Sequence, residues 1–232
     1  MARYLRRARV ERPEPGFPFD LAAVHALADL RFDAPATFLV GENGTGKSTL
    51  LEALALAAGC NAHGGSHNLR TVGHGTESVL HEHLRLTWGR RAPNRFFLRG
   101  ETFLDAVAAY DRPSDRGRFV ALTRASHGES VITLLCRLPG KGLLLVADEP
   151  DDGLSVTGQL AVLRRCQQLV DEGAQLIVAT HSPVLTALPD AQIWELDDSG
   201  IREVKWADTD STVLLRSFLD QPERFLARLL RE

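Results

Sequence analysis

The sequence predicts an α/β fold in which a mainly parallel sheet is flanked by helices, with an antiparallel β part at the N-terminus. Short apolar runs that suit buried strands alternate with segments whose apolar residues recur three or four positions apart, as they do in helices. We expect the buried strands at residues 37–40, 142–147 and 175–180. This alternation is typical of a sheet that is covered by helices on both faces.

Each expected helix has an apolar stripe and a recognisable end. Residues 48–58 carry leucines at helical spacing and stop before Gly59, and residues 128–138 follow a segment of small residues. Two further helices are expected to turn apolar residues inward: Leu160, Leu163, Cys166 and Leu169 within residues 157–172, and Phe225, Leu226, Leu229 and Leu230 in a last helix that Pro222 opens.

The remaining β structure is expected near the two ends and in the middle of the chain. Residues 3–12 and 17–32 mix β-type residues with charges and Pro-Gly turns, which indicates antiparallel strands leading into the strand at 37–40. Residues 78–88 alternate enough to suggest a strand. Residues 193–204 are typical of a hairpin that turns at residues 198–200.

Length and composition indicate one soluble domain over residues 1–232, since 44% of the residues are apolar and 25% are charged. The net charge of −3 provides no general attraction to nucleic acid or acidic membranes. The cysteines Cys60, Cys136 and Cys166 form no CxxC pair and suggest buried thiols in a reducing cytoplasm. We expect no membrane insertion, because no apolar run reaches the roughly 18 to 20 residues that a crossing needs.

Residues 41–48 form a phosphate-binding motif. They fit GxxxxGK[ST], follow an apolar strand and open a helix, which is the context that this motif requires. The alternative is a glycine-rich turn without a ligand. In the phosphate-binding interpretation, Lys47 supplies a charge to the outer phosphates and Ser48 a hydroxyl to Mg²⁺. The expected nucleotide contacts are Gly41, Asn43, Gly44, Thr45, Gly46, Lys47, Ser48 and Thr49.

Two carboxylates end the apolar strand at 142–147. Asp148 is expected near Mg²⁺, and Glu149 is placed to orient or deprotonate an attacking water. Adjacent carboxylates of this kind suit hydrolysis better than phosphoryl transfer to a bulky acceptor. The alternative is a solvated acidic turn, since Asp151 and Asp152 extend the run.

The order of these motifs resembles the ATP-binding-cassette (ABC) type ATPases, including the heads of chromosome-maintenance and break-repair proteins, and most closely small standalone bacterial predicted ATPases. Residues 126–130 resemble the ABC signature, usually LSGGQ, and precede the carboxylate strand as in that family. The resemblance implies that Ser126, Gly128 and Glu129 bind the γ-phosphate held by the phosphate loop of another subunit. Such a site suits a helix start that is left open for an anion.

Two further features follow the family order, and one departs from it. Residues 148–155 resemble the Walker B carboxylates and the D-loop, and His181 resembles the switch histidine that senses the γ-phosphate. Without the other motifs, the alternative interpretation is that His181 lies in an ordinary turn at the end of a strand. The family has a glutamine between the phosphate loop and the signature, whereas the first glutamine here is Gln159. Glu101 is the nearest substitute as a group near Mg²⁺; the alternative is an exposed loop glutamate.

Two clusters suggest other ligands. Five histidines crowd residues 63–83, but their spacing fits no tetrahedral zinc site, and solvated loop histidines are the better interpretation. A basic and aromatic mixture over residues 88–99 suits contact with nucleic acid or the nucleotide; the favoured alternative is arginine stems covering an apolar edge. Tyr4 is expected in the core rather than stacked on adenine.

The resemblance implies a cytoplasmic ATPase that binds ATP and Mg²⁺ and forms a head-to-tail homodimer around two nucleotides. Catalysis would depend on Lys47, Glu149 and His181, and hydrolysis would let the halves part. An alternative is a slow or inactive nucleotide-dependent module that binds DNA or a protein partner. A transporter cassette is a third possibility, disfavoured by the missing glutamine. The segment between the first helix and the signature has no heptads, so no coiled-coil arm is expected there.

Overall fold

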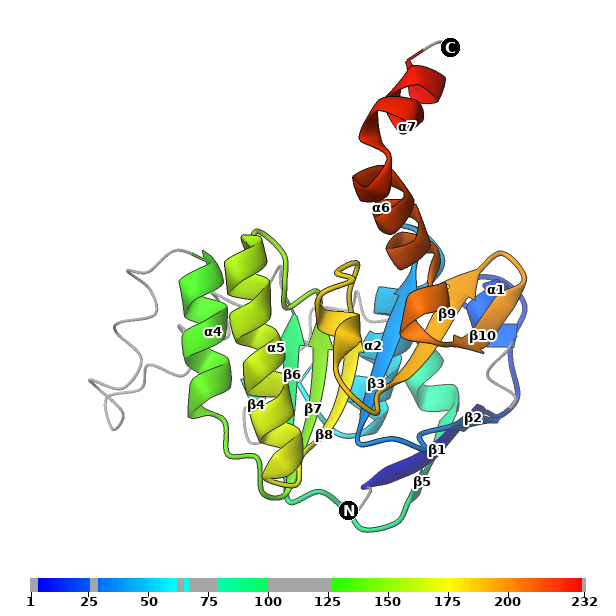
Figure 1. Ribbon diagram of the computed structural model, residues 1–232. Coiled ribbons are helices and arrows are strands. Elements are labelled where there is room, and N and C mark those ends of the chain that lie inside the picture. The colour runs from blue at the N-terminus through cyan, green and yellow to red at the C-terminus, as the bar shows by residue number, and fades with distance from the viewer. Residues whose placement is uncertain (1–3, 26–28, 62–64, 67–78, 100–126, 231–232) are drawn as a thin grey trace.

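The computed structural model describes residues 4–25, 29–61, 65–66, 79–99 and 127–230 (Figure 1). Its elements follow one another in this order: β1 (Leu5–Val10), α1 (Ala22–His25), β2 (Leu30–Arg31), β3 (Ala36–Gly41), α2 (Lys47–Ala57), β4 (Gly65–Ser66), a 3₁₀ helix (Val79–His83), β5 (Leu84–Trp88), β6 (Asn94–Arg99), α4 (His127–Arg137), β7 (Leu143–Asp148), α5 (Val156–Asp171), β8 (Gln175–Ala179), a 3₁₀ helix (Leu185–Ala187), β9 (Gln192–Asp197), β10 (Gly200–Val204), a 3₁₀ helix (Trp206–Asp208), α6 (Asp210–Asp220) and α7 (Pro222–Leu229).

The strands form two sheets, as the sequence predicts. The central sheet has the order β10-β9-β3-β8-β7-β6-β4, in which β9, β3, β8, β7 and β6 are parallel and the edge strands β10 and β4 are antiparallel. The smaller sheet, β2-β1-β5, is antiparallel. Because the parallel strands share one direction, β3, β7 and β8 all end at one edge of the central sheet. We call it the carboxyl edge.

Side chains of the central sheet alternate between two hydrophobic cores. In β7, Leu144 and Val146 pack in the core that contains α2 and the antiparallel sheet, whereas Leu145 and Ala147 pack in the core that contains α4 and α5. Figure 1 shows α4 and α5 side by side over one face of the sheet. The expected covering of both faces by helices is therefore confirmed.

A buried glutamine joins the two sheets. Gln175, at the start of β8, accepts hydrogen bonds at its Oε1 from the backbone N–H groups of Tyr4 (3.0 Å) and Leu5 (2.8 Å). Its Nε2 donates to the Leu5 carbonyl at 2.8 Å. The oxygen and the nitrogen of this buried side-chain amide are thus both hydrogen-bonded. These bonds fix where the smaller sheet joins the central sheet. Tyr4 is buried, as expected, and its hydroxyl donates to the Gly173 carbonyl at 3.2 Å.

Three expectations for the N-terminal half are wrong in detail. Within residues 17–25 and 29–32, which the structure describes, Ala22–His25 form the helix α1 and only Leu30–Arg31 form a strand. Residues 79–83 form a 3₁₀ helix, so the strand starts at Leu84. The sequence analysis also missed β6, because arginines at both ends shorten its apolar run to Phe96, Phe97 and Leu98.

The expected buried faces of two helices also need correction. In α5 the stripe facing the core is Val162, Cys166, Leu169 and Val170, whereas Leu160 is 52% exposed. Leu160 precedes Val162 by two residues, about 200° around the helix, so it lies on the far side from that stripe. Cys60 and Cys166 are buried as expected, but Cys136 of α4 is exposed.

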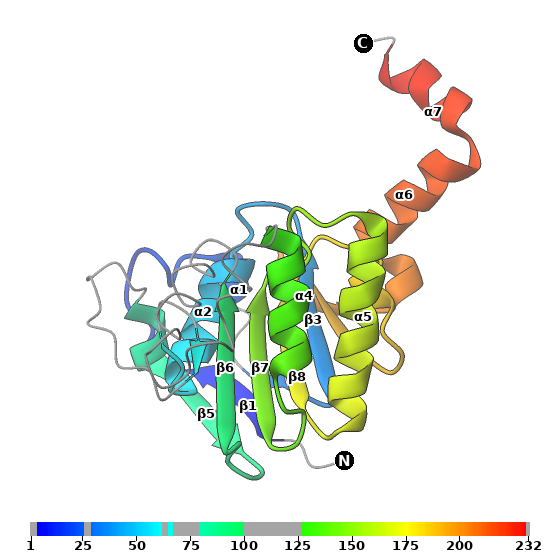
Figure 2. The same ribbon diagram turned by 90° about the vertical axis from the view of Figure 1, so that its left-hand side faces the viewer.

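The two last helices project from the body of the protein. We call residues 210–230, which comprise α6 and α7, the C-terminal arm. Both views show it extending away from the carboxyl edge (Figures 1 and 2). The expectation that α7 turns its apolar residues inward is wrong: none of its residues is buried, and Leu229 is 61% exposed. An amphipathic pattern identifies an apolar stripe but not the molecule that covers it.

Candidate functional site

The phosphate loop connects β3 to α2 at the carboxyl edge, and its backbone conformation requires glycine at two positions. Gly46 has φ 94° and caps the N-terminus of α2. Gly41 has φ 139°, and a Cβ there would lie 2.2 Å from the carbonyl oxygen of Leu196 in the neighbouring strand β9. Any other residue at these positions would strain or displace the loop. The loop therefore has the form that the motif predicts, with a helix N-terminus behind it.

Lys47 holds the loop from within. Its side chain is buried, and Nζ donates hydrogen bonds of 2.8 Å to the carbonyls of Gly41 and Glu42. Burial lowers the pKa of this ammonium, while the nearby carboxylates of Glu149 and Asp148 act in the opposite direction. An ammonium has three N–H donors, so the two bonds within the loop leave one for an anion at the mouth of the loop.

Ser48 and Asp148 bring two oxygen ligands together from α2 and β7. The Ser48 hydroxyl donates to Asp148 Oδ1 at 3.2 Å. Burial raises the pKa of Asp148 to about 6, although the Ser48 hydrogen bond acts to lower it. Hydroxyl and carboxylate oxygens are the ligands that Mg²⁺ prefers, and Mg²⁺ commonly takes only one or two from the protein. This pair fits a magnesium site.

The raised pKa of Asp148 makes a prediction about stability. The folded protein favours the protonated form of Asp148. The stability that this preference contributes is fully present below the ordinary aspartate pKa of 3.8 and is lost as the pH rises through about 6. Asp148→Asn, which keeps an acceptor for Ser48, should raise the free energy of unfolding at pH 7.5 by on the order of 2 kcal/mol in chelator-treated buffer. Urea unfolding at pH 7.5 and 4 measures this, and the gain should shrink at pH 4. Destabilisation by asparagine at pH 7.5 would contradict the prediction.

Glu149 and His181 meet at the ends of the neighbouring strands β7 and β8. Glu149 has a positive φ of 48°, and its N–H donates to the Ala179 carbonyl at 2.9 Å. Non-glycine residues seldom adopt this conformation, which is common at functional sites. His181 Nε2 lies 3.6 Å from Glu149 Oε1, and both side chains are about 40% exposed, at 42% and 41%. A carboxylate and an imidazole thus face solvent together beside the phosphate loop.

Hydrogen bonds fix the two loops that carry this pair. Thr180 Oγ1 donates to Asp151 Oδ1 at 2.5 Å, which ties the loop after β8 to the loop after β7. Ser182 Oγ donates to Gln159 Oε1 at 2.8 Å and connects the same loop to α5. Ser155 caps α5 by accepting from the Gly158 N–H at 3.2 Å. The segment around His181 is therefore a braced structure rather than a free turn.

A pocket of about 250 Å³ opens beside the loop. We call it the phosphate pocket; its lining consists of Phe17, Leu21, Asn43, Gly44, Gly46, Lys47, Ser48, Thr49 and Glu149. The sequence analysis missed Phe17, which is 69% exposed. Its only signal is an aromatic residue within a Gly-Phe-Pro turn, a segment that gives no helical or strand pattern.

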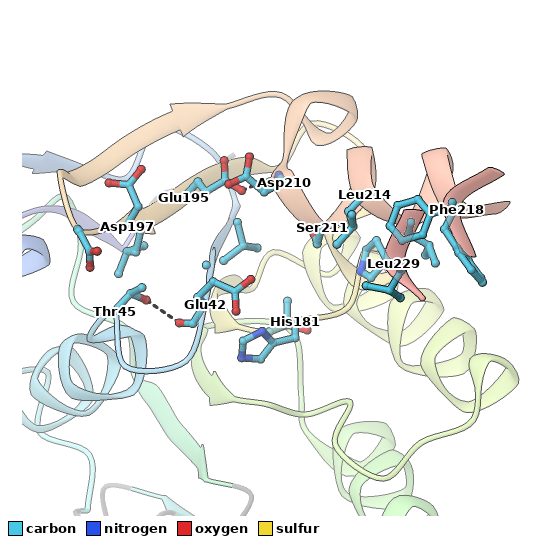
Figure 3. A pocket seen from close by; sticks show the side chains of 18 residues that line it. Glu42, Thr45, His181, Glu195, Asp197, Asp210, Ser211, Leu214, Phe218 and Leu229 are labelled. Carbon is cyan, nitrogen blue, oxygen red and sulfur yellow. Dashed lines mark hydrogen bonds between the residues drawn. The ribbon is translucent and has the colours of Figure 1, made fainter. Parts of the chain in front are cut away.

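A larger cavity of about 660 Å³ lies between the carboxyl edge and the C-terminal arm. Figure 3 shows Glu42, Thr45 and His181 on one side and Leu214, Phe218 and Leu229 of the arm on the other. We call it the arm cavity. Carboxylates of Glu195, Asp197, Asp198 and Asp210 also line it. Because several carboxylates would repel a polyphosphate, the phosphate pocket is the better place for one.

Some predicted site residues stay predictions. Ser126 and Glu101 lie outside the described residues. The helix α4 begins at His127, close to the expected start, with Glu129 exposed in its first turn. Of the five histidines, only His81 and His83 are described, and within the described ranges no group of three or more metal-binding side chains occurs.

The basic and aromatic segment around β6 belongs to the body of the protein. Phe96 and Phe97 are buried, and Arg95 Nη1 donates to the Ala58 carbonyl at 3.0 Å. Arg99 pairs with Glu52 of α2 at 3.2 Å. These aromatic rings cannot stack on a nucleic acid base, and the structure fits the alternative of arginine stems covering an apolar edge.

Comparisons with known proteins agree with this geometry. A family model described as an AAA domain matches residues 23–81, which include the phosphate loop. A nucleotide-free ATP-binding cassette from an ABC transporter is similar over 94% of this chain and 96% of its own, with TM-score 0.53 and 12% identity. The cbiO1 protein from Clostridium perfringens, part of the ABC transporter complex cbiONQ, is similar over 98% and 100%, with TM-score 0.51 and 16% identity. The chain has the fold of an ABC-type P-loop ATPase.

A third cassette-containing structure extends this similarity. An inward-facing structure of a putative metal-chelate type ABC transporter matches over 93% of this chain and 88% of its own, with TM-score 0.53 and 15% identity. No curated protein matches the chain significantly. In the described part of this ABC-type fold, none of the helices has both the length and the apolar character that a membrane crossing requires.

Proposed function

We propose that this protein hydrolyses ATP to ADP and phosphate, and that two copies close around two ATP molecules and part after hydrolysis. The observation that carries the proposal is the meeting of Lys47, Ser48 and Glu149 around one pocket, with His181 3.6 Å from Glu149. A phosphate-binding loop alone is common to kinases and hydrolases. The carboxylate and imidazole at its mouth favour hydrolysis.

Binding depends on the loop and the helix behind it. The N–H groups of the loop and the N-terminus of α2 attract the phosphates, and the remaining N–H of Lys47 binds an outer phosphate oxygen. Ser48 and Asp148 would hold Mg²⁺, which neutralises phosphate charge when it is bound. Asp148 must be ionised to serve as a ligand, so Mg²⁺ competes with a proton on a carboxylate whose pKa is about 6.

Hydrolysis uses the exposed pair at the pocket mouth. The Glu149 carboxylate accepts a proton from water as the water oxygen bonds to the γ-phosphorus, and the bond from that phosphorus to the bridging oxygen of ADP breaks. His181 donates a hydrogen bond to a γ-phosphate oxygen, so its contact with Glu149 reports whether that phosphate is present. The braced loop that carries His181 holds the imidazole in position.

The second copy completes the site. In this dimer, the first turn of α4, which begins at His127, faces the γ-phosphate that the other copy holds. Ser126, Gly128 and Glu129 contact that phosphate. Each triphosphate then joins two chains. Loss of the γ-phosphate removes that connection and lets the copies separate.

Light scattering of the Glu149→Gln variant tests the proposal. With MgATP the variant should double in mass, and without nucleotide it should remain a monomer. Asp152→Asn, a neighbouring exposed carboxylate, is the matched control and should behave as the unsubstituted protein does. A monomer under both conditions, in protein shown to bind MgATP, would rule out the shared site. Dimerisation of the unsubstituted protein without turnover would favour the nucleotide-dependent binding module.

The position of Phe17 leads to a prediction about how the adenine base of ATP is recognised. Its exposed ring lines the phosphate pocket and is placed to stack on the adenine, and such stacking contributes about 1–3 kcal/mol per base. Phe17→Ala should weaken ATP binding about tenfold in calorimetry while inorganic triphosphate binds as before. An equal loss for both ligands would show that Phe17 supports the loop instead of the base.

A further inference from the structure

The arm cavity has an apolar wall that the described part of the chain leaves exposed. Leu214, Leu215 and Leu229 of the C-terminal arm line it and are 59%, 43% and 61% exposed. The helices of the arm have 11 and 8 residues, and within them only Thr212 is buried. Helices this short are marginal in water on their own, because most helical stability in proteins comes from packing of an apolar face. The exposed apolar face of the arm therefore favours a packing partner at this cavity.

The opposite wall of the cavity is acidic. Arg202 pairs with Glu195, Asp197 and Asp210. Glu42 and Asp198 have no ion pair with any described residue. Figure 3 shows Glu42 directed into the cavity between His181 and the arm. A segment that carries both apolar and basic side chains would complement these two walls.

The sequence of this chain contains such a segment. Residues 116–124 read RGRFVALTR, which combines arginines with a phenylalanine, a valine and a leucine. The segment ends two residues before Ser126, in a stretch whose structure lies outside the described residues. In the proposed dimer Ser126 of one copy lies over the phosphate loop of the other. That loop also borders the arm cavity, at Glu42 and Thr45.

We infer that the arm cavity binds residues 116–124 of the second copy. This inference rests on the proposed dimer, because the signature of that copy brings the segment to the cavity. A fully extended chain spans at most about 3.3–3.6 Å per residue, which sets the upper limit on how far the segment can extend from Ser126. Its apolar residues cover the C-terminal arm, and its arginines face Glu42 and Asp198. Each copy supplies one cavity and one segment, so the contact forms twice in a two-fold dimer.

A charge exchange between two chains tests this contact. Both chains carry Glu149→Gln, so that MgATP holds the dimer. The first also carries Asp198→Lys and Asp210→Lys in the arm cavity, two exposed positions. The second carries Arg116→Glu and Arg118→Glu. Each chain alone opposes like charges in both contacts, whereas a dimer of one chain with the other pairs opposite charges in both.

Native mass spectrometry with one chain isotope-labelled counts the dimers. With MgATP, each chain alone should dimerise at least about tenfold more weakly than the Glu149→Gln parent, and the mixture should form mixed dimers at near-parental affinity. Circular dichroism melting and MgATP binding confirm that each chain is folded. Unchanged self-association of both folded chains, or a mixture no stronger than its components, would overturn the inference. A parent that stays monomeric would overturn the proposed function itself, so the two failures are distinguishable.

Discussion

Replacement of Glu149 by glutamine should lower steady-state phosphate release from MgATP at least about 100-fold, while the affinity for ATP stays within about threefold. Glutamine keeps the size and an oxygen of the side chain but accepts no proton from water. Glu149 lines the phosphate pocket and its side chain is 41% exposed, so the fold should not depend on its charge. A coupled assay of released phosphate and calorimetric titration with ATP measure the two quantities.

The neighbouring acidic residue provides the control for this variant. Asp152 is exposed in the same turn, and Asp152→Asn should leave turnover within about twofold. If both substitutions reduce turnover equally, the net charge of the turn matters rather than a general base. Undiminished turnover in Glu149→Gln would contradict the assignment of the base. Absence of turnover in the unsubstituted protein, with normal ATP binding, would favour the binding module.

The features that the sequence predicts well depend on residues close together in the chain. The loop at residues 41–48 forms between a strand and a helix that both have clear patterns, so its position follows directly. To predict that Glu149 and His181 meet, one must also know the order of the strands in the sheet. Both residues follow parallel strands, and β7 and β8 prove to be neighbours in the sheet. Carboxyl ends of adjacent parallel strands converge, so the two residues come together once the strand order is known.

The features that the sequence does not predict depend on which surface packs against which. The leucines of α7 form a stripe like that of a core helix, yet they are exposed because nothing in the described body of the protein covers the C-terminal arm. Leu160 was assigned to the wrong face of α5 for the same reason: hydrophobicity alone does not choose between two possible stripes. Phe17 belongs to the site only because the chain folds back over the phosphate loop.

Replacement of Lys47 by methionine should weaken ATP binding at least about 100-fold, with little loss of stability in the absence of nucleotide. The ammonium is buried, and burial lowers its pKa because the charged form loses water. That cost is offset in the folded protein by two hydrogen bonds to the loop carbonyls. Methionine has no ammonium group, so it removes both the cost of burying the charge and the two hydrogen bonds, and its apolar stem is similar to that of lysine.

Stability and binding therefore separate for this lysine. For a residue whose role is purely structural, loss of binding would accompany a large fall in melting temperature. Lys47→Met should instead melt within a few degrees of the unsubstituted protein and fail to gain stability when MgATP is added, because ligands stabilise only the state that binds them. Lys141→Ala, at an exposed lysine, should keep the full gain. Undiminished stabilisation of Lys47→Met by MgATP would place the triphosphate elsewhere, and a large fall in its melting temperature without nucleotide would make the lysine a structural residue.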